Sequence, residues 1–444
     1  MTTADHPTRI LPGTPEWTEL LARIAAGASD RDLNDENPFD AVAALKHTGF
    51  GTLRLPAEAG GAGFTVPQLF SAVVDVAHAD PIVAHIFRTH FWFVEERLRT
   101  ADQPTSRAWL DKVAAGKVFG NAFSEKGSLA VGSLVFKTRL LPDPANPGNY
   151  RLNGEKFYST GTLFSDYLTV TATTDHDSVA NVVVPAGRDG VRIFDDWDGF
   201  GQRRTGTGTT AFTDVAVGAD EVLSDTPYDV APEPTVQYAS LQLFIHAVVA
   251  GILESVVDDG VALLRSRDRS FSHALTEQPS EDPLYQKLLG ELASTAYIAR
   301  ASVLDAAAAI GAATASEIDG VPDADLAAEA QLKVAKVKVH LDSVAPEAAT
   351  RLLELGGASA ASRKRNLDRH WRNIRTITLH NPVVYKARVI GQNLLHDTPI
   401  PRTPTSDPHY PGDLCLISIA QWLLRFVVGC RWAVTGWWYR LVVW

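Results

Sequence analysis

The sequence predicts an α+β protein in which helices come first, a β unit follows and a long helical bundle completes the fold. Apolar residues recur at helical spacing in the first hundred residues and again after residue 235, whereas extended, β-branched runs fill the interval between. We therefore expect four parts: an N-terminal helical domain (1–117), an antiparallel β domain (118–228), a C-terminal four-helix bundle (229–400) and an atypical tail (401–444) that is not part of the fold.

The N-terminal part has clear helix signals. Thr14 is a suitable N-cap and Pro15 suits the first helical position. Further helices are expected from Asn37–Pro38, over Val66–Ala79 and over His85–Leu98, with a glycine-rich loop at Pro56–Gly63.

The middle part is predicted to be a small antiparallel barrel or sandwich. Asn153–Gly154 predicts a tight hairpin turn that leads into Lys156–Tyr158. Other β-type runs are 134–140, Leu168–Ala172, Val182–Val184 and Thr209–Val217.

The last part contains long alanine-rich helical segments, expected at Leu241–Leu264, Pro283–Ala313 and Ala324–Leu355. The tail changes composition abruptly and holds both cysteines. Its longest uncharged run, Leu414–Leu424, is shorter than the roughly 20 residues that span a bilayer. We expect an extension with no role in the chemistry, with an amphipathic surface anchor as the alternative.

Bulk composition excludes several classes of protein. A formal charge of −11 argues against non-specific nucleic-acid binding, which needs a basic surface. Two cysteines provide neither a disulfide framework nor a cysteine zinc site, and no HExxH motif occurs, so no metal is expected. The polar first ten residues lack the apolar run of a signal peptide, which favours the cytoplasm, and membrane association is not expected.

Four motifs stand in a recognisable order. They are Gly120–Glu125, Lys156–Gly161, Asp195–Trp197 continuing into Gly201–Thr209, and Asp368–Arg375 followed by Leu379–Pro382. Together with the order of elements, they resemble the acyl-CoA dehydrogenase family over about residues 15–400. The resemblance is sharper to the oxygenating branch, which includes dibenzothiophene monooxygenases and sulfur-acquisition oxidoreductases. It implies the acyl-CoA-dehydrogenase fold and a homotetramer.

One absence separates the two branches. An acyl-CoA dehydrogenase needs a glutamate that removes a proton from the acyl thioester. The family's two locations for that base correspond to Trp371–His396 and Thr235–Leu253, and neither segment contains a carboxylate. The resemblance therefore implies a monooxygenase that uses FMN in its reduced form (FMNH2) and O2, through a C4a-(hydro)peroxyflavin, on a small substrate. The oxygen would go to a soft nucleophile such as the sulfur of an organosulfur compound, with an activated carbon or nitrogen as the alternatives.

The source of reduced flavin is expected to be a separate protein. No nicotinamide-binding βαβ unit is found, and Gly206–Gly208 leads into a strand, so it is not a dinucleotide fingerprint. A flavin reductase is therefore the implied partner. Two alternatives stay open: an FAD-dependent acyl-CoA dehydrogenase with a displaced base such as Glu254, and a flavin-free scaffold protein.

The resemblance assigns catalytic roles to His90, Ser159, Thr160 and His380, which would hold the oxygenating flavin and move protons. From the residues alone, His90 equally fits a core histidine and His380 a helix-end histidine. Ser159 and Thr160 equally fit turn hydroxyls. The dibenzothiophene enzymes have a further histidine where this chain has Ile377, which leaves the substrate open.

The resemblance also implies a set of flavin-binding residues. Arg269 and Phe271 would reach the flavin phosphate across a subunit interface, although Arg269 also fits a solvated charge. Trp197 would wall the flavin or substrate, or belong to the core. The full set is Asn121, Ser124, Thr160, Trp197, Arg269, Phe271, Gly356 and Gly357.

Overall fold

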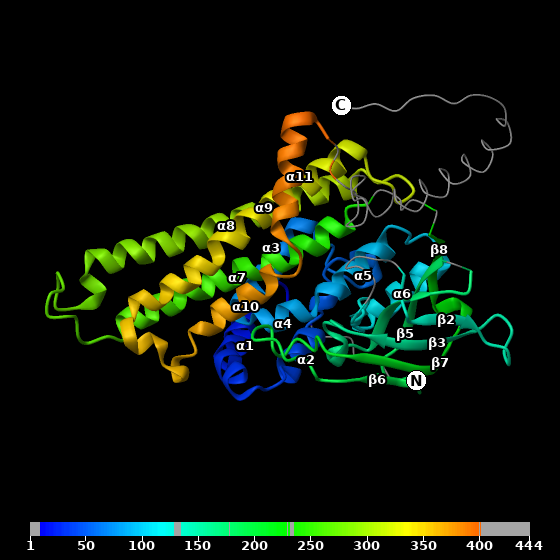
Figure 1. The fold of residues 1–444 in the computed structure, drawn as a ribbon, viewed down its shortest axis with the longest axis horizontal. Coiled ribbons are helices and arrows are strands. Elements are labelled where there is room, and N and C mark those ends of the chain that lie inside the picture. The colour runs from blue at the N-terminus through cyan, green and yellow to red at the C-terminus, as the bar shows by residue number, and fades with distance from the viewer. Residues whose placement is uncertain are drawn as a thin grey trace, which may run out of the picture. The chain divides into compact units, whose positions relative to one another are not determined.

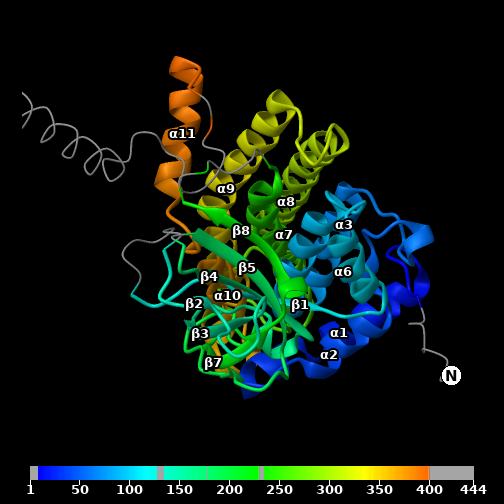
Figure 2. The same cartoon turned by 90° about the vertical axis from the view of Figure 1, so that its right-hand side faces the viewer.

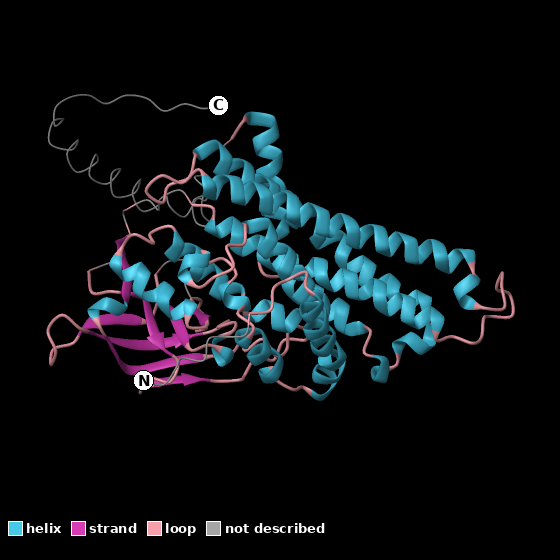
Figure 3. Cartoon of the chain, turned by 180° about the vertical axis from the view of Figure 1, so that it is seen from behind, coloured by secondary structure: helices cyan, strands magenta, loops and turns pink. Residues whose placement is uncertain are grey.

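A computed structural model describes residues 9–127, 135–176, 178–228, 230, 235–398 and 400. The predicted order of helices, sheet and helices is confirmed, and the strands gather on one side of the helices (Figure 3). The expectation for the tail concerns residues outside the described ranges.

Helices of the N-terminal part start at recognisable caps. Thr14 accepts a hydrogen bond from the backbone N–H of Trp17, and Thr65 forms a capping box with Gln68, so both predicted starts are found. The helices are α1 (Pro15–Asn34), α2 (Phe39–His47), α3 (Val66–Ala79), α4 (Pro81–Ile86), α5 (Arg88–Leu98) and α6 (Pro104–Ala114).

The middle part is one eight-stranded sheet (Figures 1 and 2). Its strands are β1 (Phe119–Ala122), β2 (Arg139–Pro142), β3 (Tyr150–Lys156), β4 (Tyr167–Thr173), β5 (Ser178–Pro185), β6 (Val191–Ile193), β7 (Thr210–Val217) and β8 (Val222–Pro227). The order is β6-β7-β3-β2-β4-β5-β8, with β1 beside β4. Most pairs are antiparallel as predicted, but β1–β4 and β2–β4 are parallel, so the sheet is mixed.

The predicted hairpin turn at Asn153–Gly154 is wrong. Both residues lie inside β3, and the register against β7 shifts between Leu152 and Gly154, which marks a bulge. Gly154 has φ +144°, and a side chain there would overlap Thr138, so close approach of β2 explains the glycine. The Asn153–Gly154 pair does mark an irregular backbone position, but that position is a bulge and not a turn.

The C-terminal part consists of long helices packed beside one another (Figure 1). They are α7 (Gln237–Arg265), α8 (Pro283–Ala315), α9 (Ala324–Leu352), α10 (Asp368–Thr378) and α11 (Val383–His396). The helix α7 is buried along most of its length because α3, α8 and α9 all pack against it. Its apolar composition is therefore that of a core helix.

Candidate active site

Two motif segments lie side by side on the sheet. The backbone N–H of Phe157 donates to the Ser124 carbonyl at 2.8 Å, and that of Asn121 to the Thr160 carbonyl at 3.4 Å. The Asn121 amide also reaches the carbonyl of Tyr158 at 3.5 Å. The structure thus brings together the two segments that the sequence assigned to flavin binding.

A buried ion pair fixes these segments. Lys156 Nζ donates to Glu125 Oε1 at 2.8 Å, and the two side chains are 0% and 3% exposed. Glu125 also accepts the backbone N–H groups of Lys137 and Thr138, so its charge is well satisfied. Burial lowers the pKa of Lys156 to about 8, and Glu125 acts in the opposite direction.

A row of hydroxyl groups follows Lys156. Thr160 Oγ1 lies 2.9 Å from Thr207 Oγ1, which lies 2.6 Å from the buried Thr205 Oγ1. The Ser159 hydroxyl is buried and has no hydrogen-bond partner among the described residues. An unpaired buried hydroxyl is costly, so Ser159 is suited to bond a ligand atom.

Aromatic side chains border the hydroxyl row. Tyr158 is 51% exposed and has φ +60°, and its ring lies 5.8 Å from that of Trp197. Trp197 is half-buried and also packs against Phe157 at 6.4 Å. These rings provide flat apolar faces next to polar donors.

The loop from 194 to 209 ties the sheet to α10. The backbone N–H of Gln202 donates to Asn373 Oδ1 at 2.7 Å, and Phe200 stacks on Trp371 at 5.8 Å. A side chain at Gly201 would overlap the carbonyl oxygen of Arg372, so this close approach requires glycine. The position of α10 is therefore set by the same loop that carries Thr205 and Thr207.

The junction of α4 and α5 meets the hydroxyl row from the other side. A Cβ on Gly161 would lie 2.7 Å from the carbonyl oxygen of Ile86. His85 Nδ1 donates to Gln202 Oε1 at 2.9 Å, and its buried Nε2 has no partner among the described residues. Burial, followed by the charge of Arg88, lowers the pKa of His85 to about 4, so it is neutral at pH 7.

His380 follows α10 and reaches the same junction. Arg88 Nη1 lies 3.3 Å from His380 Nε2, and Arg88 Nε donates to the Leu241 carbonyl at 3.0 Å. Because a guanidinium only donates, His380 Nε2 accepts and its proton resides on Nδ1. The His380 side chain has an exposed surface. Desolvation by the surrounding protein is the largest cause, and the electrostatic effects of Arg88 and then His85 add to it, so the pKa of His380 is lowered well below 6.5.

His90 lies apart from these groups. It is fully buried on α5, its Nε2 donates to the Gly51 carbonyl at 2.8 Å, and its ring stacks on Phe119. Burial lowers its pKa to about 4. The structure does not bring His90 into contact with Thr160 or His380, and its catalytic role stays a prediction.

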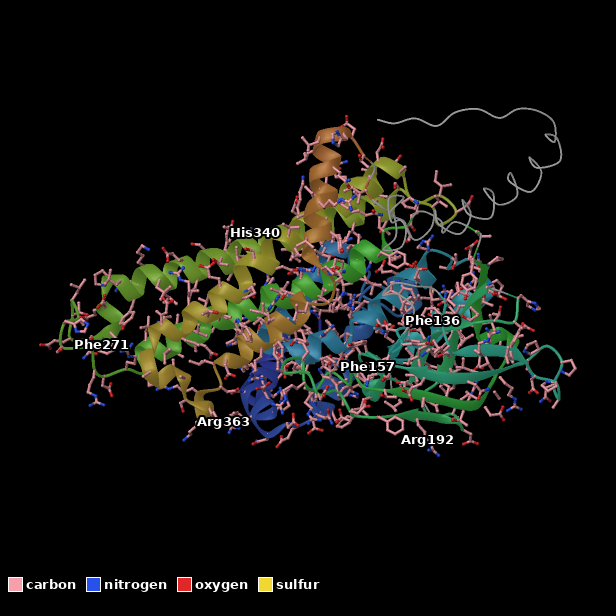
Figure 4. The ribbon with its side chains drawn as sticks, viewed as in Figure 1. Phe136, Phe157, Arg192, Phe271, His340 and Arg363 are labelled. Atoms are coloured by element: carbon pink, nitrogen blue, oxygen red, sulfur yellow. The ribbon has the colours of Figure 1, made fainter. Side chains whose placement is uncertain are left out.

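The remaining flavin-binding candidates lie at the far end of the bundle. Phe271 is 55% exposed and lies beside Gly357, and Figure 4 places it well away from Phe157. Gly356 packs closely on Leu263 of α7, and Arg269 is exposed. Within one chain these residues therefore do not meet the hydroxyl row.

Glu254, the alternative base, is paired with Arg300. Both of its carboxylate oxygens accept from Arg300, at 3.1 and 3.2 Å, and His78 lies 3.6 Å away. It makes no contact with His380 or with the hydroxyl row among the described residues.

Sequence reasoning missed three residues of the site: His85, Arg88 and Gln202. His85 was expected only as part of the helix His85–Leu98. The sequence offered only a weak indication for Arg88: it is a charged residue between Phe87 and Thr89, in a helical stretch that is otherwise buried.

The cluster fits an isoalloxazine ring. The unpaired Ser159 hydroxyl, the half-buried Thr160 hydroxyl and the Asn121 amide supply hydrogen-bonding groups for its polar edge. Tyr158 and Trp197 supply apolar faces. The residues present are thus those that would hold a flavin.

Comparisons with known proteins agree with this geometry. The family model "Acyl-CoA dehydrogenase, C-terminal domain" matches residues 243–385. A dibenzothiophene monooxygenase of Rhodococcus qingshengii is 30% identical over 394 residues, which cover 86% of this chain and 93% of that protein. A probable FMNH2-dependent monooxygenase of Pseudomonas putida, SfnC, is 27% identical over 385 residues, covering 85% and 93%.

A solved structure extends the likeness to the fold. The FMN-bound TdsC of Paenibacillus sp. A11-2 superposes with a TM-score of 0.78 at 28% identity, covering 88% of this chain and 98% of that one. The predicted acyl-CoA-dehydrogenase fold is therefore confirmed. With this fold, the motif order and the extent of the matches, the chain belongs to the flavin-dependent monooxygenase branch of the acyl-CoA dehydrogenase family.

Proposed function

We propose that this protein is a two-component flavin monooxygenase. It takes FMNH2 from a separate flavin reductase and uses O2 to oxygenate a small organosulfur substrate. The observation that carries the proposal is a chain of contacts that runs from the Ser159–Gly161 segment to the α4–α5 junction at Ile86, and from Arg88 in that junction to His380. Membership of the monooxygenase branch and the FMN bound by the related TdsC support the choice of cofactor.

The protein's own residues bind, orient and move protons. Reduced flavin, when bound, supplies the electrons that activate oxygen. Ser159 and Thr160 would hold its polar edge, while Tyr158 and Trp197 would cover its ring and exclude water. His380, whose proton resides on Nδ1, would be the proton donor.

The dehydrogenase alternative lacks support. It needs a carboxylate base near the flavin, and the bidentate contact with Arg300 holds Glu254 elsewhere. No other observation favours that reaction.

We also propose a homotetramer in the cytoplasm. Two features support the assembly. The helix α11 has no buried residue and exposes the apolar side chains Val384, Tyr385, Leu394 and Leu395. Phe271 lies beside Gly357 and well away from Phe157 (Figure 4), so a second subunit would have to supply it to a flavin held by the Phe157–Thr160 segment.

The test is isotope incorporation. The protein is mixed with photoreduced FMN, ¹⁸O2 and a panel of organosulfur compounds, and products are analysed by mass spectrometry. One ¹⁸O atom per product, dependent on reduced FMN, is expected. Acyl-CoA oxidation with FAD and no ¹⁸O in any product would refute the proposal. Thr160→Val should lower FMN affinity, whereas Arg363→Gln, at an exposed position on the bundle (Figure 4), should not.

A further inference from the structure

A group of ionisable side chains lies inside the helical bundle. Lys338 Nζ donates to Asp342 Oδ2 one turn further along α9, at 2.7 Å, and the two side chains are 0% and 4% exposed. His246 of α7 is also fully buried, and its Nε2 donates to the other carboxylate oxygen of Asp342 at 3.1 Å. Burying such groups is costly unless each is paired, and here one carboxylate pairs with both bases.

The contacts continue from His246 to the turn that follows α10. His246 Nδ1 lies 2.9 Å from the backbone carbonyl oxygen of Gln242 and 3.3 Å from its side-chain amide nitrogen. Gln242 Oε1 accepts a hydrogen bond from Asn381 Nδ2 at 2.8 Å. Asn381 directly follows His380 in the sequence. A continuous series of polar contacts thus links the bundle to the residue beside the expected proton donor.

We call this series the anchor network, and its members are Lys338, Asp342, His246, Gln242 and Asn381. The first two belong to α9 and the next two to α7, whereas Asn381 lies in the turn between α10 and α11. The helices α7 and α9 pack against each other along the bundle. The network therefore connects a non-helical segment to two rigid elements.

The turn that carries His380 is held at one place on α7. Among the described residues, the His380 side chain makes one hydrogen-bonding contact, with Arg88 Nη1 at 3.3 Å. Arg88 Nε in turn donates to the carbonyl oxygen of Leu241 at 3.0 Å. Leu241 and Gln242 are consecutive residues, so His380 and Asn381 both reach the same turn of the helix.

The bases of the anchor network also act on the charge of His380. Desolvation, followed by Arg88 and His85, lowers the pKa of His380, and Lys338 and His246 act in the same direction. The network thus lies close enough to His380 to help keep its imidazole neutral. An imidazole that moved away from these groups toward solvent would have a pKa closer to the ordinary value of 6.5.

We propose that Gln242 and His246 are positioning residues for His380. Through Asn381, the anchor network holds the turn after α10, so that the imidazole keeps its place beside Arg88. This inference rests on the proposed function, in which His380 is the proton donor. A misplacement of about 1 Å can lower the rate of a reaction about 100-fold, so a loosened turn would release hydrogen peroxide in place of product.

The test is a double-mutant cycle on the ratio of oxygenated product to hydrogen peroxide, measured with FMNH2 and ¹⁸O2 on the organosulfur panel. Gln242→Met removes the polar atoms that contact His246 and Asn381 and keeps the length of the side chain. It should lower the ratio about 10-fold when His380 is present, and less than about twofold in a His380→Ala background. Equal falls in both backgrounds, or no fall in either, would overturn the inference.

Two variants complete the cycle. Asn381→Ala breaks the same contact from its half-buried end, so adding it to Gln242→Met should lower the ratio no further. Gln286→Met is the matched control, because Gln286 is an exposed glutamine of α8 that donates to the Ser280 carbonyl at 3.0 Å. FMN affinity and the melting curve should stay at wild-type values in the single variants. A lower melting temperature with an unchanged ratio would make Gln242 a structural residue only, against the proposal.

His380 can also be followed without turnover. Diethyl pyrocarbonate modifies neutral imidazole, so its rate of reaction against pH reports the pKa of His380, and the tryptic peptide Thr376–Lys386 contains no other histidine. In wild type this pKa should lie below 6.5, and Gln242→Met should raise it toward 6.5. An unchanged profile would overturn the inference.

Failure of the inference differs from failure of the proposed function. If no compound acquires ¹⁸O, the oxygenase is wrong, and the diethyl pyrocarbonate profile still decides whether Gln242 positions His380. If wild-type protein oxygenates a compound and Gln242→Met keeps the ratio of product to peroxide, the oxygenase stands and the positioning role is wrong.

Discussion

Replacing Glu125 by glutamine would leave the Lys156 ammonium group buried without a counter-charge. The pair is almost completely inaccessible, and glutamine can keep only one of the two backbone hydrogen bonds that the carboxylate accepts. Removing one partner of a buried pair costs about 3–5 kcal/mol. We expect a loss of about 4 kcal/mol in local stability at pH 7, together with weaker FMN binding, because the pair fixes the segments of Asn121 and Thr160.

The stability penalty of Glu125→Gln should change with pH, and the pKa of Lys156 gives the direction of that change. The folded-state pKa of Lys156 is about 8, below its ordinary value of 10.5, so the unfolded chain binds more protons in that window. Stability contributed by this group therefore rises with pH across the window. Without Glu125 the folded-state pKa falls further. The penalty of Glu125→Gln should shrink between pH 7 and pH 9, as Lys156 becomes neutral in both proteins.

The assay is hydrogen exchange of peptides that cover Phe119–Ala122 and Tyr150–Lys156, at both pH values and corrected for intrinsic exchange rates. Glu329→Gln, which removes an exposed partner of Lys333, is the control and should cost less than about 1 kcal/mol. A loss below about 1 kcal/mol for Glu125→Gln, or a loss that is the same at both pH values, would refute the reasoning.

Three further predictions concern the site and its supports. His380→Ala should divert O2 to hydrogen peroxide and lower oxygenation by about 100-fold or more; an unchanged ratio of product to peroxide would remove His380 from the chemistry. In wild type, the fall of the oxygenation rate at low pH that comes from protonation of His380 should lie below pH 6.5. Gly201→Ala should destabilise the protein by about 1–3 kcal/mol, because its Cβ would overlap the Arg372 carbonyl; an unchanged melting temperature would contradict this. Truncation after Arg402 should retain FMN-dependent oxygenation, and loss of folding or activity would give the tail a role.

Local signals predicted the elements well. The predicted cap at Thr14 acts within one helical turn, and the long apolar periodicity of α7 reflects its burial directly. Asn153–Gly154 failed because a turn and a bulge both use glycine for its backbone freedom, and only the neighbouring β2 strand distinguishes them.

The candidate site depends on contacts that no local pattern contains. Arg88 and His380 are 292 positions apart, and Glu125 meets Lys156 across 31 positions, so their partnerships follow from the packing of α4–α5, α10 and the sheet. The resemblance supplied residue roles but not that packing. It could not indicate that His90 would face Gly51, or that Arg88 would contact His380.

The groups around the site come from separate parts of the chain. The loop that follows β3 provides Ser159 and Thr160, whereas Arg88 begins α5 and His380 follows α10. The geometry of the site therefore depends on how α5, α10 and this loop pack on one another, and not on any one element. A substitution at such a contact, distant from the hydroxyl row, would change the distances between the groups of the site.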